Sequence, residues 1–271
     1  MMSFLSYIQW NVDPEIIRLG AVALRWYGLL FASGFVAGQY IMSNIFKIEG
    51  KSEADLDALL VIMILSTIIG ARLGHCLFYA PDYYLANPIK ILYMWEGGLA
   101  SHGATIGILT GLWYYTRSRP DQSWLWILDR IVITVALGGC FIRLGNLMNS
   151  EIIGLPTEVP WAFVFEKVDQ LPRHPAQLYE SISCLFLFFF LYFLYMKYKT
   201  KTPEGLLFGI FLVVCFGLRF FYEFLKENQE AFEEGMFLNM GQILSIPLVL
   251  FGIWVIYRSL NPKVLNSEKV K

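Results

Sequence analysis

Arg143, Asn146 and Asn149 follow one another at three-residue intervals in FIRLGNLMNSEIIG, residues 141–154, a stretch that ends a long apolar run. At this spacing the three side chains share one face of a helix and form a polar row that leads out of the apolar segment. A guanidinium presents a planar fork of N–H donors that fits the oxygens of a phosphate. The row therefore predicts a site for an anionic group at the end of the apolar segment.

A second arginine, Arg219, has Glu223 four residues later in FGLRFFYEFLKENQE, a spacing at which two charged side chains on a helix form an ion pair. Like Arg143, it falls near the end of an apolar run. Two guanidiniums at a similar depth suit the phosphate of a phospholipid. The alternative for both arginines is a purely structural network of ion pairs.

Three further arginines, Arg25, Arg72 and Arg130, fall inside or at the ends of apolar runs. Each costs about 2.5–3.5 kcal/mol near the centre of a bilayer. They must therefore reach an interface, pair with acids, or line a polar cavity. Arg130 adjoins Asp129 and Arg72 lies close to the end of its run, so a structural role and a functional one both stay open.

The three histidines, His75, His102 and His174, are scattered and lack the paired spacing of a zinc site. A lone histidine is usually a packing residue, and that interpretation is preferred for His75. His102 differs because glycines surround it, which permits close backbone approach in a membrane helix. It either packs there or faces a cavity. The flanking glycines are Gly97, Gly98, Gly103 and Gly107.

The elements that position these residues are predicted to be membrane helices. The chain has 271 residues, of which 56% are hydrophobic and 16% charged, so lipid is the solvent for much of it. A membrane-spanning helix needs roughly 17–25 mostly apolar residues. The hydropathy pattern predicts an all-α integral membrane protein with about seven transmembrane helices, over residues 19–42, 57–79, 98–116, 124–146, 177–196, 205–225 and 239–258.

Residues 1–271 are expected to form a single polytopic membrane domain, in which 147–176 are a small cap between the fourth and fifth helices. This proline-rich segment contains the strand-like stretch WAFVFEKV. Lysine and arginine favour cytoplasmic loops, and they gather on the side of the C-terminus. The N-terminus and the cap are therefore predicted to face outward and the C-terminus to face the cytoplasm. The C-terminal side holds Lys47, Lys51, Arg117, Arg119, Lys197, Lys199, Lys201, Arg258, Lys263, Lys269 and Lys271, against Arg18, Lys90, Lys167, Arg173 and Lys226 on the other.

The net charge of −1 gives no reason to expect a nucleic-acid partner. The four cysteines all lie in apolar runs, which indicates buried free thiols rather than a disulfide framework or a metal site. They are Cys76, Cys140, Cys184 and Cys215.

In these motifs the chain resembles the bacterial prolipoprotein diacylglyceryl transferases. The family signature Gly-Arg-x-Gly-Asn-Phe-x-Asn-x-Glu-x-x-Gly is matched at Arg143, Gly145, Asn146, Asn149, Glu151 and Gly154. It departs at Ile142, where the family usually has glycine, and at Leu147, where it usually has phenylalanine; neither change removes a polar group. Further matches keep the order of the family motifs over nearly the whole chain. They are RWYG (25–28), GARLGH (70–75), GGLASHGATIG (97–107), RHPAQLYE (173–180), RFFYEF (219–224) and MGQILSIP (240–247).

The resemblance implies a multi-pass transferase of the bacterial plasma (inner) membrane that acts in lipoprotein biosynthesis. A diacylglyceryl group would pass from phosphatidylglycerol to the thiol of a lipobox cysteine in a prolipoprotein. The thiol attacks a glycerol carbon, a thioether forms, and glycerol phosphate leaves. No cofactor and no metal are expected.

The resemblance also implies roles for individual residues. Arg143 and Arg219 would clamp the phosphate, with Glu223 beside Arg219. His102 would be the general base or a headgroup contact. Asn146, Asn149 and Glu151 would orient the headgroup or the arginines, Gly154 would let the cap turn tightly, and Tyr27 would contact lipid or peptide.

Charge stabilisation is expected to matter more than the base in this reaction. A thiol with a pKa of about 8.5 is already a few per cent ionised at pH 7, so full deprotonation gains roughly 30-fold. One group that stabilises developing charge contributes about 10²–10³ in rate. The two arginines are therefore the leading catalytic candidates.

Three other classes of function are weaker. A transporter or binding protein for an anionic solute or lipid would show related halves, and no repeat is visible. A transferase that uses another lipid phosphate would need acidic metal-binding clusters, which are not evident. A purely structural membrane protein would have little use for five arginines in its spans.

Overall fold

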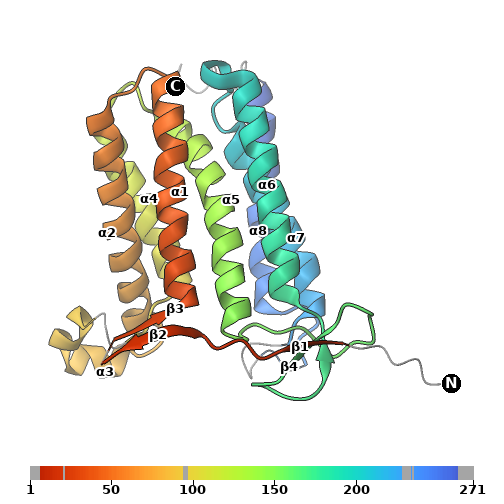
Figure 1. The fold of residues 1–271 in the computed structure, drawn as a ribbon. Helices are drawn as coiled ribbons and strands as arrows, with labels where there is room; N and C mark the ends of the chain where they lie inside the picture. Colours follow the sequence, from red (N-terminus) through yellow and green to blue (C-terminus); the bar gives the residue numbers. More distant parts are fainter. Residues whose placement is uncertain (1–6, 21, 94–96, 228–232, 234, 262–271) are drawn as a thin grey trace. The chain divides into compact units, whose positions relative to one another are not determined.

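The computed structural model describes residues 7–20, 22–93, 97–227, 233 and 235–261. Lys263, Lys269 and Lys271, which contribute to the predicted orientation, lie outside these residues. The chain divides into two compact units (Figure 1). The first comprises residues 1–41 and 129–271, and the second comprises residues 42–128. The boundaries between the units fall within two helices, formed by Trp26–Ile48 and Trp124–Met148.

Six helices of the described residues are long and apolar enough to cross a membrane. The predicted all-α integral membrane fold is therefore confirmed, and the protein is a multi-pass membrane protein. The six are α1 (Trp26–Ile48), α2 (Glu53–Phe78), α5 (Trp124–Met148), α6 (Ala176–Tyr198), α7 (Leu206–Tyr222) and α8 (Met240–Leu260). The remaining predicted span, 98–116, forms α4 (Ser101–Arg117), which has only 17 residues and is rich in small and polar side chains.

The first helix begins at Trp26 rather than at residue 19, because the preceding residues form a hairpin. Strand β2 (Glu15–Leu19) pairs antiparallel with β3 (Val22–Arg25). Gly20 lies in the connection with φ +63°, a conformation that glycine adopts without steric cost. Arg25 therefore lies in a strand outside the helix, where its side chain is exposed and lies 3.4 Å from Glu15.

The second unit is built on close packing of α2 against α4 (Figure 1). Glycines on both helices let the backbones touch. A Cβ atom at Gly103 would overlap the carbonyl oxygen of Gly70 and would lie 2.6 Å from the Cα of Gly74. Backbone contact of this kind is the usual way in which membrane helices gain packing energy.

Arg72 has a structural role in this unit. It is buried, and its guanidinium donates to the carbonyls of Lys90 (2.7 Å), Ile91 (2.9 Å), Gly97 and Gly98. These carbonyls belong to the 3₁₀ helix η1 (Pro88–Leu92), which follows the short helix α3 (Pro81–Ala86), and to the segment before α4. Of the two interpretations left open for Arg72, these contacts support the structural one.

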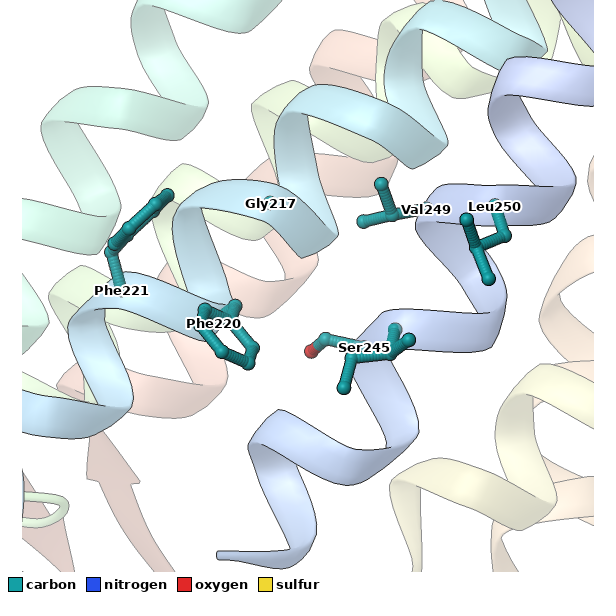
Figure 2. A pocket seen from close by; sticks show the side chains of 7 residues that line it. Gly217, Phe220, Phe221, Ser245, Val249 and Leu250 are labelled. Carbon is teal, nitrogen blue, oxygen red and sulfur yellow. The ribbon is translucent and has the colours of Figure 1, made fainter. Parts of the chain in front are cut away.

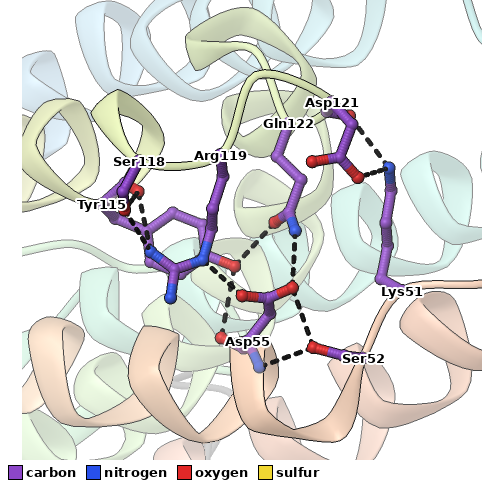
Figure 3. A network of polar contacts seen from close by, with 8 residues as sticks. All are labelled: Lys51, Ser52, Asp55, Tyr115, Ser118, Arg119, Asp121 and Gln122. Atoms are coloured by element: carbon purple, nitrogen blue, oxygen red, sulfur yellow. Dashed lines mark hydrogen bonds and ion pairs between the residues drawn. The ribbon is translucent and has the colours of Figure 1, made fainter.

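A polar network joins the N-terminal end of α2 to the C-terminal end of α4 (Figure 3). Asp55 accepts from Arg119 (2.5 Å) and from the buried side chain of Gln122 (3.2 Å). Gln122 in turn accepts from the hydroxyl of Tyr115 (2.6 Å). Lys51 lies 2.7 Å from Asp121 and holds the pKa of that exposed carboxyl below its usual value.

The segment between α5 and α6 contains β4 (Phe163–Phe165) and β5 (Pro172–Arg173), so the predicted strand is present but short. Strand β1 (Ile8–Trp10) pairs parallel with β4, and β4 pairs antiparallel with β5. Phe163 and Phe165 pack with Leu147 at the end of α5, and Trp10 donates to the Leu147 carbonyl at 3.0 Å. This small sheet therefore anchors the N-terminal strand and the 149–175 segment to the end of α5.

Asp129 caps α7 from a different helix. Its buried carboxylate accepts from the backbone N–H of Gly205 (2.6 Å) and of Phe208 (2.9 Å), at the first turn of α7. The first N–H groups of a helix have no intrahelical partner, and an anion there also complements the helix dipole. Arg130 lies 3.8 Å from the same carboxylate, so this arginine also has a structural partner.

Asp129→Ala is expected to destabilise the protein by about 1–3 kcal/mol, because two buried donors lose their acceptor. Thermal unfolding in detergent, followed by tryptophan fluorescence, measures the change. Asp121→Ala serves as the control, since its exposed ion pair is worth about 1 kcal/mol or less. An unfolding temperature for Asp129→Ala equal to that of the wild type would contradict the capping role.

Candidate active site

The predicted polar row at the end of α5 forms a continuous chain of contacts. Arg143 Nη1 donates to Asn146 Oδ1 at 3.3 Å. The side chains of Asn146 and Asn149 each donate to one oxygen of Glu151, both at 3.1 Å. The carboxylate of Glu151 thus fixes both amides, and through Asn146 it helps to orient Arg143.

The chain reverses immediately after α5 through Ser150 (φ +54°) and Ile152 (φ +57°). Gly154 was expected to provide this turn, but its function in the fold is a close backbone approach. A Cβ atom there would overlap the carbonyl oxygen of His174 and would lie 2.8 Å from that of Leu225. Gly154 therefore lets the segment after α5 lie between the start of α6 and the end of α7.

Arg143 is held by a carboxylate of the next helix. Its Nε lies 2.6 Å from Oε2 of Glu180 in α6. The contact is ionic rather than a directed hydrogen bond, because Oε2 has no hydrogen-bond donor among the described residues. Glu180 is only 7% exposed. The remaining guanidinium donors of Arg143 belong to its two terminal nitrogens, of which Nη1 also donates to Asn146.

The predicted pair on α7 is confirmed, with Arg219 Nε 3.4 Å from Glu223 Oε1. Glu223 is buried and also receives Asn239 Nδ2 at 3.2 Å. Gly241, at the start of α8, permits this approach, because a Cβ atom there would lie 2.7 Å from the Glu223 carboxylate. Arg219 keeps 38% of its side chain exposed.

A buried lysine links these two arginine–glutamate pairs. Lys226 Nζ lies 2.6 Å from Oε1 of Glu180 and 3.0 Å from Oε1 of Glu223. Arg143 and Arg219, which the sequence predicts to act together, are therefore joined through three buried side chains. We call Arg143, Glu180, Lys226, Glu223 and Arg219 the charge bridge.

The sequence missed Glu180 and Lys226 as members of the site. Glu180 is the last residue of the motif RHPAQLYE. In the sequence, Lys226 has the position of an ordinary loop lysine. A signal was present, because Glu223 and Lys226 are three residues apart, a spacing that favours an ion pair on a helix. Their convergence with Glu180 depends on the packing of α6 and α7, which residue spacing does not encode.

Tyr27 packs directly on α5, since a Cβ atom at Gly145 would lie 2.7 Å from its ring. Close to the polar row, the β2–β3 hairpin and the residues that follow α5 border an open hollow of about 420 Å³. Asn149 and Glu151 face this hollow, which makes them accessible to a polar ligand. It is lined by Asp13, Pro14, Glu15, Arg18, Arg25, Asn149 and Glu151.

An apolar hollow of about 250 Å³ lies between α7 and α8 (Figure 2). Gly217, Phe220 and Phe221 border it from one face of α7, and Arg219 lies on the opposite face of that helix. Its lining is apolar except for Ser245, whose hydroxyl donates to the carbonyl of Gly241 at 2.6 Å. A surface of this kind suits hydrocarbon rather than a polar solute.

The histidines lie in both units. His102 follows Ser101 at the N-terminus of α4, which belongs to the second unit. His174 belongs to the first unit, where its Nδ1 lies 3.2 Å from the hydroxyl of Tyr179 and burial lowers its pKa. Among the described residues no group of three or more histidine, cysteine or acidic side chains could hold a metal ion.

Arg173 joins the cap segment to the residue that follows Lys226, the central member of the charge bridge. It donates to both oxygens of Asp169, to the carbonyl of Gly154 (3.1 Å) and to Glu227 (2.5 Å), next to Lys226. The hydrogen bonds from Arg173 hold the pKa of Asp169 below its usual value.

Comparison with known proteins agrees with this arrangement. A family model described as prolipoprotein diacylglyceryl transferase matches residues 14–258. The phosphatidylglycerol--prolipoprotein diacylglyceryl transferase of Chloroherpeton thalassium is 51% identical over 266 residues, which cover 98% of this chain and 99% of that one. The proteins of the same name from Tolumonas auensis and Bacteroides fragilis are 50% and 45% identical and cover 94% and 95% of this chain, and 98% and 97% of their own lengths.

These similarities extend over nearly the whole chain, and the range that the family model matches contains the positions of the charge bridge and of the polar row. The chain belongs to the prolipoprotein diacylglyceryl transferase family.

Proposed function

We propose that this protein transfers the diacylglyceryl group of phosphatidylglycerol to the lipobox cysteine of prolipoproteins, with formation of a thioether and release of glycerol phosphate. The observation that carries the proposal is the charge bridge. It presents two guanidiniums at the ends of membrane helices in a chain whose relatives are named for this substrate pair.

The chemistry follows from the charge that develops in the reaction. As the C–O bond to the phosphate breaks, negative charge builds up on the phosphate oxygens. Arg143 and Arg219 carry the donors that stabilise it, and within a low-dielectric site such donors act strongly. Asn146, Asn149 and Glu151 position the glycerol headgroup, since amides and carboxylates bind hydroxyls. The apolar hollow between α7 and α8 supports a lipid substrate, because it offers contact to hydrocarbon.

His102 is the proposed general base, or alternatively a headgroup contact, and Tyr27 is proposed to contact the lipid or the peptide. Gly154 contributes by permitting the close backbone approach after α5. Glu223 contributes by holding Arg219. No step requires a cofactor, because thiolate attack and departure of the phosphate balance without electron transfer.

The proposed setting is the bacterial inner membrane, with the N-terminus and the 147–176 cap facing outward and the C-terminus in the cytoplasm. We propose that residues 1–271 act as a single polytopic domain. The distribution of lysine and arginine supports this orientation. It places the polar row at the outer leaflet, where the mature part of a translocated precursor would meet the enzyme. No nucleic acid is involved.

The test uses purified protein in detergent micelles with phosphatidylglycerol and a lipobox peptide. The expected result is a peptide whose mass increases by one diacylglyceryl group, together with one equivalent of glycerol phosphate. A peptide with serine in place of the cysteine is the control and is expected to give neither product. Absence of both products with the cysteine peptide, from protein that is folded by circular dichroism, would refute the proposal.

A further inference from the structure

The buried lysine of the charge bridge has no role in the chemistry proposed above. The side chain of Lys226 is only 1% exposed, so it does not lie on a surface that a substrate could reach. An unpaired ammonium in such a place would be strongly unfavourable. The two carboxylates at 2.6 and 3.0 Å are therefore its structural partners, and its effect on any ligand passes through them.

The backbone at Lys226 is also fixed. Lys226 forms an antiparallel bridge with Gly154, and the preceding carbonyl, of Leu225, accepts from the N–H of Leu155 at 2.8 Å. The backbone that carries the ammonium is thus held by hydrogen bonds to the segment that contains Gly154 and Leu155. A cation held in this way fixes the distance between the two carboxylates that it joins.

Each carboxylate in turn holds one arginine by the same atom. Glu180 lies beside Nε of Arg143 and Glu223 lies beside Nε of Arg219. Anchoring at Nε leaves the two terminal nitrogens of a guanidinium as the donors for a ligand. Among the described residues, Glu223 is the only acid within ion-pair distance of Arg219. Each guanidinium is therefore held at Nε, and Lys226 joins the two carboxylates that hold them.

We propose that Lys226 is a positioning residue, which sets the separation and direction of the Arg143 and Arg219 guanidiniums by joining Glu180 to Glu223. The expected effect of Lys226 on the reaction rate rests on the proposed function. Its effect on the positions of the two arginines does not. Lys226 is distinguished from a residue that only stabilises the fold, because its loss frees two specific arginines.

The first measurement is kinetic. Lys226→Met is expected to lower kcat for diacylglyceryl transfer by about 100-fold, as a misplacement of catalytic groups by about 1 Å does. KM for phosphatidylglycerol is expected to change by less than about threefold, because contacts that tighten only in the transition state affect kcat more than KM. Lys226→Arg, which keeps a cation at the junction, is expected to recover at least about a tenth of the wild-type kcat.

A charge-matched variant tests whether the rate depends on the positions of the arginines or on the net charge of the charge bridge. The charge bridge contains three cations and two anions, so its net charge is +1. Lys226→Met combined with Glu180→Gln leaves two cations and one anion, again +1, and leaves no uncompensated carboxylate to impair folding. The double variant is expected to fold and to remain as impaired as Lys226→Met. Recovery of wild-type kcat in the double variant would overturn the positioning role.

The second measurement does not depend on turnover. Phenylglyoxal modifies exposed guanidiniums, and peptide mass spectrometry gives the modification rate at Arg143 and Arg219 separately, without lipid. Both rates are expected to rise at least about threefold in Lys226→Met and in the double variant, because displacement of the shared cation loosens both anchors. Unchanged rates at both arginines would overturn the inference.

Lys51→Met is the matched control, since Lys51 is also paired with a carboxylate but lies in the second unit, outside the charge bridge. It is expected to leave kcat and both modification rates unchanged. If the wild-type enzyme forms no product, the proposed function is refuted. The positioning role of Lys226 is then judged from the modification rates alone. An active wild type with equally active Lys226→Met refutes the inference alone.

Discussion

Arg143→Ala is expected to lower kcat for diacylglyceryl transfer by about 10²–10³-fold, the effect of removing one preorganised donor to a developing anion. The reason is local geometry. Arg143 contacts Glu180 through Nε and Asn146 through Nη1, so the fork is oriented before any ligand binds. Alanine removes the donors and also leaves Glu180 with Lys226 as its one ion-pair partner among the described residues. The measurement is the rate of lipidated peptide formation at saturating phosphatidylglycerol.

Arg143→Lys tests whether the fork, rather than the charge, is required. A lysine is a point charge without the planar pair of donors, so it is expected to restore only part of the lost rate. Arg117→Ala is the control, because Arg117 lies at the end of α4 in the second unit and stacks on Trp113. A folded Arg143→Ala protein with activity within about twofold of the wild type, a change that is small beside the expected loss, would remove Arg143 from the mechanism.

Gly103→Val is expected to produce the largest loss of stability. A side chain at this position would overlap the Gly70 carbonyl and the Cα of Gly74, so α2 and α4 would have to move apart. Overpacking usually costs 1–3 kcal/mol, and a clash with backbone on both sides of the contact is expected to reach about 3 kcal/mol or more. Thermal unfolding in detergent, or the yield of monodisperse protein on gel filtration, reports the loss.

Gly138→Ala provides the contrast, because it places a methyl group on α5 where no atom lies within 4 Å. It is expected to be neutral, or stabilising by up to about 1 kcal/mol, since alanine has the higher helix propensity. If Gly103→Val unfolds at the wild-type temperature, the two helices do not pack through these glycines.

The membrane helices were predictable because an apolar run of about 20 residues has few alternatives in lipid. The hairpin before α1 was not predicted, since its residues are as apolar as those of the helix that follows. The Arg219–Glu223 pair was predictable because one helix carries both residues, and α-helical spacing fixes how close they lie.

Contacts between residues far apart in the sequence could not be predicted from residue spacing. Asp129 adjoins Arg130 in the sequence and was assigned to it, yet its hydrogen bonds go to the first turn of α7. Glu180 and Lys226 converge only because α6 and α7 pack together and a backbone bridge fixes the residues after α7. The predicted catalytic and binding roles of the site residues stay predictions until activity is measured.

The order of the charge bridge along the chain has a consequence for biogenesis. As the polypeptide leaves the ribosome, Arg143 enters the membrane first and meets Glu180 one helix later. Glu223 and Lys226 emerge only with the end of α7, so a nascent chain that stops before this point holds the Arg143–Glu180 pair without the lysine that also neutralises Glu180. Insertion of α5 and α6 therefore depends on a single early ion pair, and the second arginine is accommodated only when synthesis is nearly complete.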